Sequence, residues 1–272
     1  MTSLQGLLRI RSLEQAIMKV FIVFAHHEPQ SFGAALLARS THTLRSLGHA
    51  VQVSDLHAMD FNPVASAADF TRRRFPELLQ YDREQKFAHE HDAFAPDIQT
   101  EIDKLLWCDF LILQFPLWWF SVPAILKGWI DRVFVNGVAY GKGRRMDSGG
   151  LKGRKAMLTV STGCYPEMVE PDGLLGDLQV NLWHLNSGTL AYAGLQVLPP
   201  YVAWSVHYCT PGQRQAYLDN YASCLAQIEH APPMFFHPLA DFGADWRLNP
   251  GVEPRAVGQR RPAPRPVAGS GA

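Results

Sequence analysis

A continuous apolar run near the start of the chain constrains the fold more than any other feature of the sequence. Residues 19–25 read KVFIVFA, with apolar and mostly β-branched or aromatic side chains after the lysine. A strand with one wet face alternates apolar and polar residues, whereas an unbroken run is typical of a parallel sheet that is covered on both faces. Leucines then recur at helical spacing up to Gly48, which stands where a helix C-cap glycine belongs. A strand followed by a helix is the repeating unit of an α/β fold.

The same alternation of strand and helix continues along the chain. Apolar runs predict further strands at residues 50–53, 110–115, 156–160 and 195–198. Asp97 is the expected N-cap of a helix, Pro123 opens the next one, and further helices are expected over residues 173–189 and 218–228. Residues 65–95 are polar and read as a long irregular excursion. These five units favour a flavodoxin-like, doubly wound, five-stranded parallel sheet with helices on both faces over a barrel.

The composition narrows the class of protein. The chain has 272 residues, 47% of them hydrophobic, which is enough for a sizeable core. Its 25 basic and 25 acidic residues cancel, so nothing suggests nucleic acid as a partner. No apolar run approaches the roughly 20 residues that cross a bilayer, so we expect no membrane insertion. The cysteines show no C-x-x-C or metal-ligand spacing, which indicates reduced thiols and a cytoplasmic protein: Cys108, Cys164, Cys209 and Cys224.

Three segments are expected along the chain. Residues 1–17 precede a sequence that itself resembles a protein start at Met18, and they lack the apolar centre of a secretory signal. We interpret them as an N-terminal extension, which a misassigned start would explain. Residues 18–230 form the α/β catalytic domain. Residues 231–272 form a C-terminal segment, which is rich in Pro, Gly, Arg and Ala from about Pro250 and is expected to be disordered from there.

Several common catalytic motifs are absent from the sequence. It contains no G-x-x-x-x-G-K-[ST] phosphate loop, no G-x-G-x-x-G, no G-x-S-x-G elbow and no H-E-x-x-H. P-loop ATPases, classical dehydrogenases, serine hydrolases and zinc proteases therefore lose their usual support. The pairs His26–His27 and His89–His91 could touch a metal, but no third ligand is spaced to join them. Surface or loop histidines explain them better, and we expect no metal site.

The first of three loops that follow predicted strands is HHEPQSFG, residues 26–33. Such loops lie at the carboxyl edge of a doubly wound sheet, where these folds bind ligands. This loop leads into a helix whose N-terminal N–H groups favour phosphate, and His26, Gln30 and Ser31 add side-chain donors. A capped helix behind a polar loop explains the segment equally well.

The second loop is PLWWFSVP, residues 116–123, which holds Trp118, Trp119 and Phe120 at a strand end. Three large aromatic side chains are costly to leave in water, and alternation cannot bury all of them in one core. The flat isoalloxazine ring of a flavin would cover them through stacking and backbone hydrogen bonds. A core position or a dimer interface is the alternative explanation.

The third loop is STGCYPEM, residues 161–168. Two hydroxyls followed by a glycine suit hydrogen bonds to the carbonyl oxygens of a ring. Donors near flavin N1 and O2 stabilise the anionic reduced flavin by electrostatic preorganisation. Taken alone, these residue types are also common in loops that bind nothing.

Four long stretches occur in a familiar order: FIVFAHHEPQSF, SDLHAMDFNP, QFPLWWFSVPAILKGWIDRVF and GDLQVNLWHLNSG. In these stretches the sequence resembles the NAD(P)H:quinone oxidoreductases of the DT-diaphorase type and their bacterial relatives. The resemblance covers roughly residues 18–230. It implies FAD as cofactor, NAD(P)H as co-substrate, a quinone-like acceptor, and a homodimer with its active site at the dimer interface.

The resemblance also implies roles for individual residues. His26, Phe32 and Gly33 would hold the phosphate and ribityl side of the flavin. The ring would be lined by the second loop and bonded at its polar edge by the third: Pro116, Leu117, Trp118, Trp119 and Phe120, then Ser161, Thr162, Gly163 and Cys164. Arg214 would face the adenine dinucleotide part. Arg74 would reach the cofactor across the dimer. Tyr140 would close the acceptor pocket from the other subunit, and with Gly163 it is a catalytic candidate.

The chain departs from the family pattern at three positions in and after the third loop. Cys164 replaces a glycine, and Val169 and Leu175 stand where the family has a tyrosine and a histidine that relay charge during hydride transfer. Hydrocarbon side chains cannot exchange a proton. We therefore expect hydride transfer from NAD(P)H through FAD to the acceptor, with the backbone around Gly163 supporting the charge of the reduced flavin. The alternatives are a regulatory flavoprotein subunit of a potassium-efflux system and an FMN-dependent azo- or nitroreductase.

Overall fold

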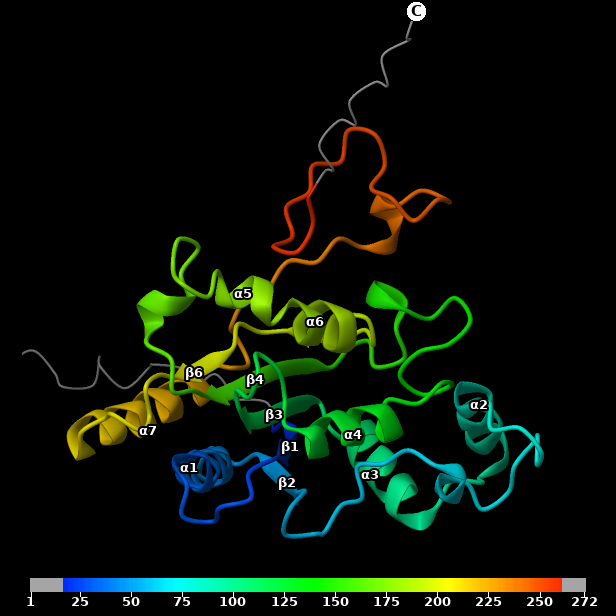
Figure 1. Cartoon of the computed structure of the whole chain (residues 1–272), viewed down its shortest axis with the longest axis horizontal. Coiled ribbons are helices and arrows are strands. Elements are labelled where there is room, and N and C mark those ends of the chain that lie inside the picture. Colours follow the sequence, from blue (N-terminus) through cyan, green and yellow to red (C-terminus); the bar gives the residue numbers. More distant parts are fainter. Residues whose placement is uncertain (1–16, 261–272) are drawn as a thin grey trace, which may run out of the picture.

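The structure, a computed structural model, describes residues 17–260, so nearly all of the expected N-terminal extension lies outside the described residues. Its centre is a six-stranded sheet in the order β2-β1-β3-β4-β5, with β6 also paired to β4 (Figure 1). Every strand pair is parallel, which confirms the doubly wound α/β prediction. The bounds are β1 Lys19–Phe24, β2 Ala50–Asp55, β3 Phe110–Pro116, β4 Lys155–Ser161, β5 Gln196–Val197 and β6 Tyr201–Ala203.

The prediction of five strands was one short, because the edge strand is broken in two. β5 pairs with the beginning of β4 at Lys155, whereas β6 pairs with its end at Ser161. Pro199 and Pro200 separate the two pieces. Proline has no N–H to donate to a ladder, so a strand is interrupted where two prolines follow one another. The sheet therefore has five positions and six strands.

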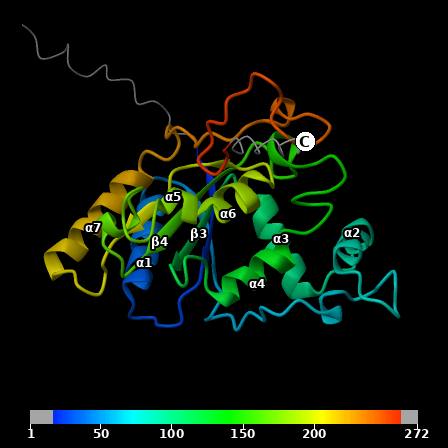
Figure 2. The same ribbon diagram turned by 45° about the horizontal axis from the view of Figure 1, so that its top comes forward.

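Helices cover both faces of the sheet, as predicted (Figures 1 and 2). Helices α1 (Phe32–Ser46) and α7 (Pro211–Leu225) pack together on one face, and α3 (Pro96–Trp107) and α4 (Ala124–Val133) lie on the other. The buried strand β1 explains why both faces need cover. Its side chains alternate between two apolar clusters, with Val20 and Ile22 in one and Phe21 and Val23 in the other, all of them fully buried.

Three helix predictions need correction. Residues 65–95 contain the helix α2 (Tyr81–His91), which was not predicted because apolar residues are sparse there. Polar contacts hold its first residue in place: the buried Arg132 donates to Asp69 at 2.8 Å, and the Tyr81 hydroxyl donates to the same carboxylate. The helix expected over residues 173–189 is a series of short pieces: α5 Leu178–Asn181, α6 Trp183–Leu185 and the π-helical η4 Asn186–Ala191. Helix α3 begins at Pro96, so its N-cap is Ala95 and not Asp97.

Short 3-10 turns complete the fold: η1 Ala67–Asp69, η2 Met146–Ser148, η3 Pro166–Val169 and η5 Leu239–Asp241. The closing helix α7 begins at Pro211 and ends at Leu225, three residues before the expected Ile228. Within residues 17–260, no helix combines the length and apolar character that crossing a membrane requires.

The C-terminal segment follows a defined path beside the domain, beyond α5 and α6 in Figure 1. It is attached where the Met234 N–H donates to the Val197 carbonyl at 2.8 Å. Residues 250–260, which belong to the stretch expected to be disordered, continue this path. Ala256 is buried, and a Cβ on Gly258 would lie only 2.2 Å from the ring of Trp183. Small residues fit closely there, although the segment has no helical or strand periodicity; residues 261–272 lie outside the described residues.

Candidate flavin site

A cavity of about 510 Å³ opens at the carboxyl edge of the sheet. Parallel strands end at the same edge, so the loops after β1, β3, β4 and β6 all reach it. It lies between β1 and β3, where the strand order reverses. Most of the predicted cofactor residues line it: His26, Gln30, Ser31, Phe32, Gly33, Pro116, Leu117, Trp118, Ser161, Thr162, Gly163 and Arg214.

One end of the cavity is suited to an anion. Ser31 caps α1 and accepts a hydrogen bond from the Ala34 N–H at 3.1 Å. The first N–H groups of a helix have no intrahelical partner, and the helix dipole adds a partial positive charge there. Gln114, buried in β3, donates to the Gly33 carbonyl at 2.7 Å and fixes this helix start against the sheet. Arg214 reaches the same cavity from the first turn of α7.

The protonation of His26 is set by its neighbours. Its Nδ1 accepts from the Glu28 N–H at 3.0 Å, which leaves the proton of the neutral ring on Nε2. Burial lowers the pKa of His26 below its usual range, and the nearby His27, His57 and His207 lower it further. A neutral His26 keeps one N–H that can donate to a phosphate oxygen.

A second part of the cavity is aromatic and has a strained backbone. Residues 118–121 form a two-residue turn closed by hydrogen bonds in both directions between Trp118 and Ser121, at 3.1 and 3.0 Å. Trp119 and Phe120 both have positive φ, 51° and 59°. Such turns normally place Asn or Gly there, and each non-glycine residue in this region costs on the order of 1–3 kcal/mol. Strain of this kind is common at ligand sites.

The three aromatic side chains of this turn are exposed, as the sequence predicted that one core could not bury them. Trp118 lines the cavity and is tilted against His27 at a ring-centroid distance of 5.8 Å. Trp119 is 95% exposed and Phe120 41% exposed, and neither lines the cavity within one chain. An exposed apolar surface of this kind is suited to binding a flat ring or another subunit.

The third loop lines the cavity with Ser161, Thr162 and Gly163. Thr162 holds the loop in place: its hydroxyl accepts from the Cys164 N–H at 3.1 Å and its N–H donates to the Ala203 carbonyl. Gly163 does not have a positive φ, so the backbone does not require glycine there. A Cβ at this position would meet only the His207 ring, at 3.6 Å. The glycine therefore leaves room in the cavity wall.

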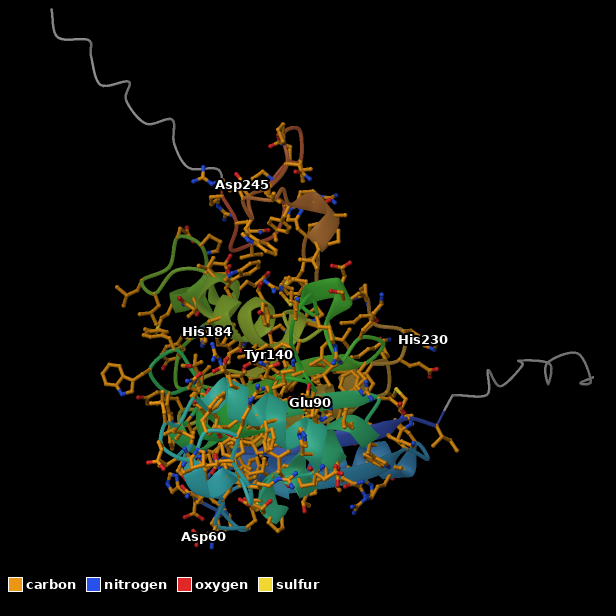
Figure 3. The ribbon with its side chains drawn as sticks, turned by 90° about the vertical axis from the view of Figure 1, so that its right-hand side faces the viewer. Asp60, Glu90, Tyr140, His184, His230 and Asp245 are labelled. Atoms are coloured by element: carbon orange, nitrogen blue, oxygen red, sulfur yellow. The ribbon has the colours of Figure 1, made fainter. Side chains whose placement is uncertain are left out.

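Besides Trp119 and Phe120, three further predicted residues do not line this cavity. Cys164 is one of them. Tyr140, labelled in Figure 3, lines a second, larger cavity of about 760 Å³. Tyr192 lines the same cavity, and its ring centroid is 6.2 Å from that of Tyr140. Arg74 lines a third cavity of about 300 Å³ beside α2. The structure of one chain thus leaves Tyr140 and Arg74 apart from the cavity between β1 and β3.

Four residues that line the cavity were not among the predicted site residues: His27, Glu28, Val206 and His207. Val206 and His207 follow β6, whose short apolar stretch after two prolines is a weak signal of another strand end. Gln114 was missed as well, although a lone polar residue inside the apolar run FLILQF marks a buried polar contact. Within the described residues, no group of three His, Cys, Asp or Glu side chains could hold a metal ion.

At the two positions where the resembled family has a tyrosine and a histidine, this chain has the hydrocarbon side chains of Val169 and Leu175. Val169 is buried in the core, and Leu175 packs against the same core. Tyr165 is exposed and stacks on Tyr208, with ring centroids 5.9 Å apart. No acid–base pair therefore stands at the two positions.

The fold and the cavity together define a doubly wound α/β protein with a ligand-sized cavity at the carboxyl edge of its sheet. The chain belongs to the family with a flavodoxin-like fold, whose model matches residues 18–227. It is 38% identical over 233 residues to NAD(P)H dehydrogenase (quinone) 1 of Cavia porcellus, and the match covers 85% of each chain. It is 40% identical over 221 residues to ribosyldihydronicotinamide dehydrogenase (quinone) of Mus musculus, covering 81% of this chain and 96% of that protein.

The solved structures agree with the sequence relatives. A candidate quinone reductase of Klebsiella pneumoniae superposes with a TM-score of 0.84 at 35% identity, covering 89% of this chain and 98% of that one. An NAD(P)H:quinone oxidoreductase of Methanothermobacter marburgensis gives a TM-score of 0.65 at 25% identity, covering 82% of this chain and all of that one.

Proposed function

We propose that this protein is a flavin-dependent reductase that passes hydride from NAD(P)H through FAD to a quinone or a similar small aromatic acceptor. The observation that carries the proposal is the single cavity between β1 and β3, which joins an anion-binding helix start to an aromatic turn and a glycine-containing loop. A flavin nucleotide needs these three surfaces together. The quinone-reductase names of the most similar relatives support the same activity.

The residues present fit a flavin with a phosphate-bearing side chain. The Nε2–H of His26, the start of α1 and Arg214 are donors suited to phosphate oxygens. Phe32 and Gly33 would flank the ribityl chain, and a Cβ on Gly33 would meet its neighbours only at 3.5 Å or more. FAD is preferred over FMN because Arg214 and His207 add two further polar side chains to the lining of the cavity.

FAD supplies two-electron chemistry, since it takes hydride from NAD(P)H and gives it to a quinone. The chain's own contribution is placement: the residues of the aromatic turn hold flat rings face to face and keep water away from the exchange. The Thr162 and Cys164 N–H groups are engaged within the fold, so the Gly163 N–H would be the backbone donor for the ring edge. The proposal requires no nucleophilic side chain.

The acceptor pocket is proposed to be completed by a second copy of the chain. Tyr140 and Tyr192 line a cavity of their own, and Trp119 is exposed, so each chain offers an aromatic half-site that it does not use itself. A homodimer would bring the two halves together, and Arg74 would reach the cofactor in the same way. We also propose a cytoplasmic location, since all four cysteines are free thiols.

Purification with a bound flavin tests the proposal. The protein is expected to be yellow or to bind added FAD, and chromatography of the released flavin separates FAD from FMN. Size-exclusion chromatography with light scattering checks the dimer. A folded dimer that binds no flavin would overturn the proposed function.

A further inference from the structure

The aromatic turn of residues 118–121 makes a side-chain hydrogen bond to a residue outside the turn. Ser121 Oγ lies 2.9 Å from Nε2 of His184, which belongs to the short helix α6. The turn's other described polar contacts are the two bonds between Trp118 and Ser121. Two of its residues have positive φ, a conformation that persists only when the surroundings enforce it. The contact with His184 is therefore a restraint on a strained element.

The direction of this hydrogen bond follows from the other ring nitrogen. His184 Nδ1 lies 3.0 Å from the carbonyl oxygen of Asn181, which can only accept. In the neutral ring the proton consequently sits on Nδ1, and Nε2 is left as an acceptor. Ser121 then donates its hydroxyl hydrogen to Nε2. The Asn181 carbonyl fixes the ring orientation, and the ring fixes the serine.

The same histidine is joined to the second cavity through its backbone. Thr189 donates its hydroxyl to the His184 carbonyl at 3.1 Å, and Thr189 lines the cavity of Tyr140 and Tyr192. His184 thus lies between the aromatic turn and the half-site proposed for the acceptor.

We propose that His184, acting through Ser121, is a positioning residue that holds the aromatic turn in its ring-binding conformation. The inference rests on the proposed function, because it assigns the turn to the flavin ring. The pair moves no proton in this proposal; it sets geometry.

Four variants of the full-length protein separate this role from a general packing role. Ser121→Ala and His184→Phe each remove the hydrogen bond, and the double variant removes both partners. His184→Gln keeps an acceptor oxygen for the serine. The matched control is His91→Phe, because His91 is exposed and its Nδ1 bonds the Phe87 carbonyl at 2.9 Å in the same manner.

Two measurements distinguish a failure of the proposed flavin function from a failure of the proposed role of His184. The dissociation constant for FAD and the visible circular dichroism of the bound flavin report on ring placement. Hydrogen exchange of residues 117–122 in flavin-free protein reports on the turn alone. A net hydrogen bond corresponds to a change of about three- to tenfold in either equilibrium.

The proposal predicts that Ser121→Ala, His184→Phe and the double variant weaken FAD binding by the same factor of about three to ten and alter the flavin dichroism. They also speed exchange in the turn, whereas His184→Gln restores both values and His91→Phe changes neither. Additive effects, or wild-type values in the single variants, would overturn it. A wild type that binds no FAD, with exchange still accelerated in the variants, would refute the flavin assignment and leave the turn restraint standing.

Discussion

Replacing Trp119 by glycine separates a ligand-binding role of this residue from a role in folding. The indole is 95% exposed, so its loss removes almost no buried apolar area. Its φ of 51° is a conformation that costs a non-glycine residue on the order of 1–2 kcal/mol. Glycine removes this cost but adds about 0.5–1 kcal/mol of chain entropy in the unfolded state. The flavin-free variant is therefore expected to gain up to about 1 kcal/mol in free energy of unfolding.

The flavin affinity of Trp119→Gly is expected to move in the opposite direction. An aromatic stacking contact contributes about 0.5–1.5 kcal/mol beyond area burial, which is up to about tenfold in the dissociation constant. Thermal unfolding of flavin-free protein, followed by FAD titration, measures both quantities. The melting temperature should rise by up to about 4 °C, the response of a domain of this size to 1 kcal/mol.

A matched control for Trp119→Gly is Trp129→Ala. Trp129 is fully buried and its indole N–H donates to Glu101 at 2.8 Å. Its truncation should cost about 3–5 kcal/mol. A destabilised Trp119→Gly, or one with wild-type FAD affinity, would refute the reasoning. A loss of stability that appears only at low protein concentration would assign the indole to a dimer interface instead.

Further predictions concern the cavity, the histidines and the buried ion pair. Gly163→Val should weaken FAD binding at least tenfold by filling the cavity wall, with no loss of stability in flavin-free protein; a large drop in melting temperature would contradict this. Burial lowers the pKa values of both His26 and His49 in the folded state. Near pH 6.5, the ordinary pKa of histidine, the unfolded chain therefore binds more protons than the folded chain. The free energy of unfolding is expected to fall as the pH drops below about 6.5. Denaturant titrations from pH 5.5 to 8 check the slope, which a His26→Gln/His49→Gln variant should reduce. Arg132→Met leaves the buried Asp69 without its partner and should cost about 3–5 kcal/mol; chemical denaturation that shows less than 1 kcal/mol would disprove it.

The architecture was predictable because its signals are local and redundant. The run KVFIVFA specifies a strand buried on both faces whatever the rest of the chain does, and Gly48 marks the end of the helix that follows. The loops after β1, β3 and β4 could be predicted to meet, since the carboxyl ends of parallel strands share an edge. Helix α2 could not be predicted in this way, and the edge strand β6 left only the weak signal of a short apolar stretch after two prolines. Arg132 and Asp69, far apart in the sequence, anchor the region of α2, and β6 has only three residues.

Individual side-chain roles were less accessible than the position of the cavity. His207 lines the cavity only because β6 delivers it there, and the contact between Ser121 and His184 joins residues 63 positions apart. No periodicity encodes such a pair. The positive φ values of Trp119 and Phe120 were also hidden, because the residue types at those positions normally avoid that conformation.

Anaerobic reduction of the FAD-loaded protein tests the central claim most directly. The account predicts that NADH or NADPH bleaches the visible flavin absorbance, and that a simple benzoquinone then restores it with one equivalent of quinone consumed per flavin. The same cycle in the Gly163→Val variant should be limited by its weaker flavin binding. A protein that binds FAD but stays oxidised with both nicotinamide cofactors, or a reduced protein that quinone does not reoxidise, would contradict the assignment as a quinone reductase.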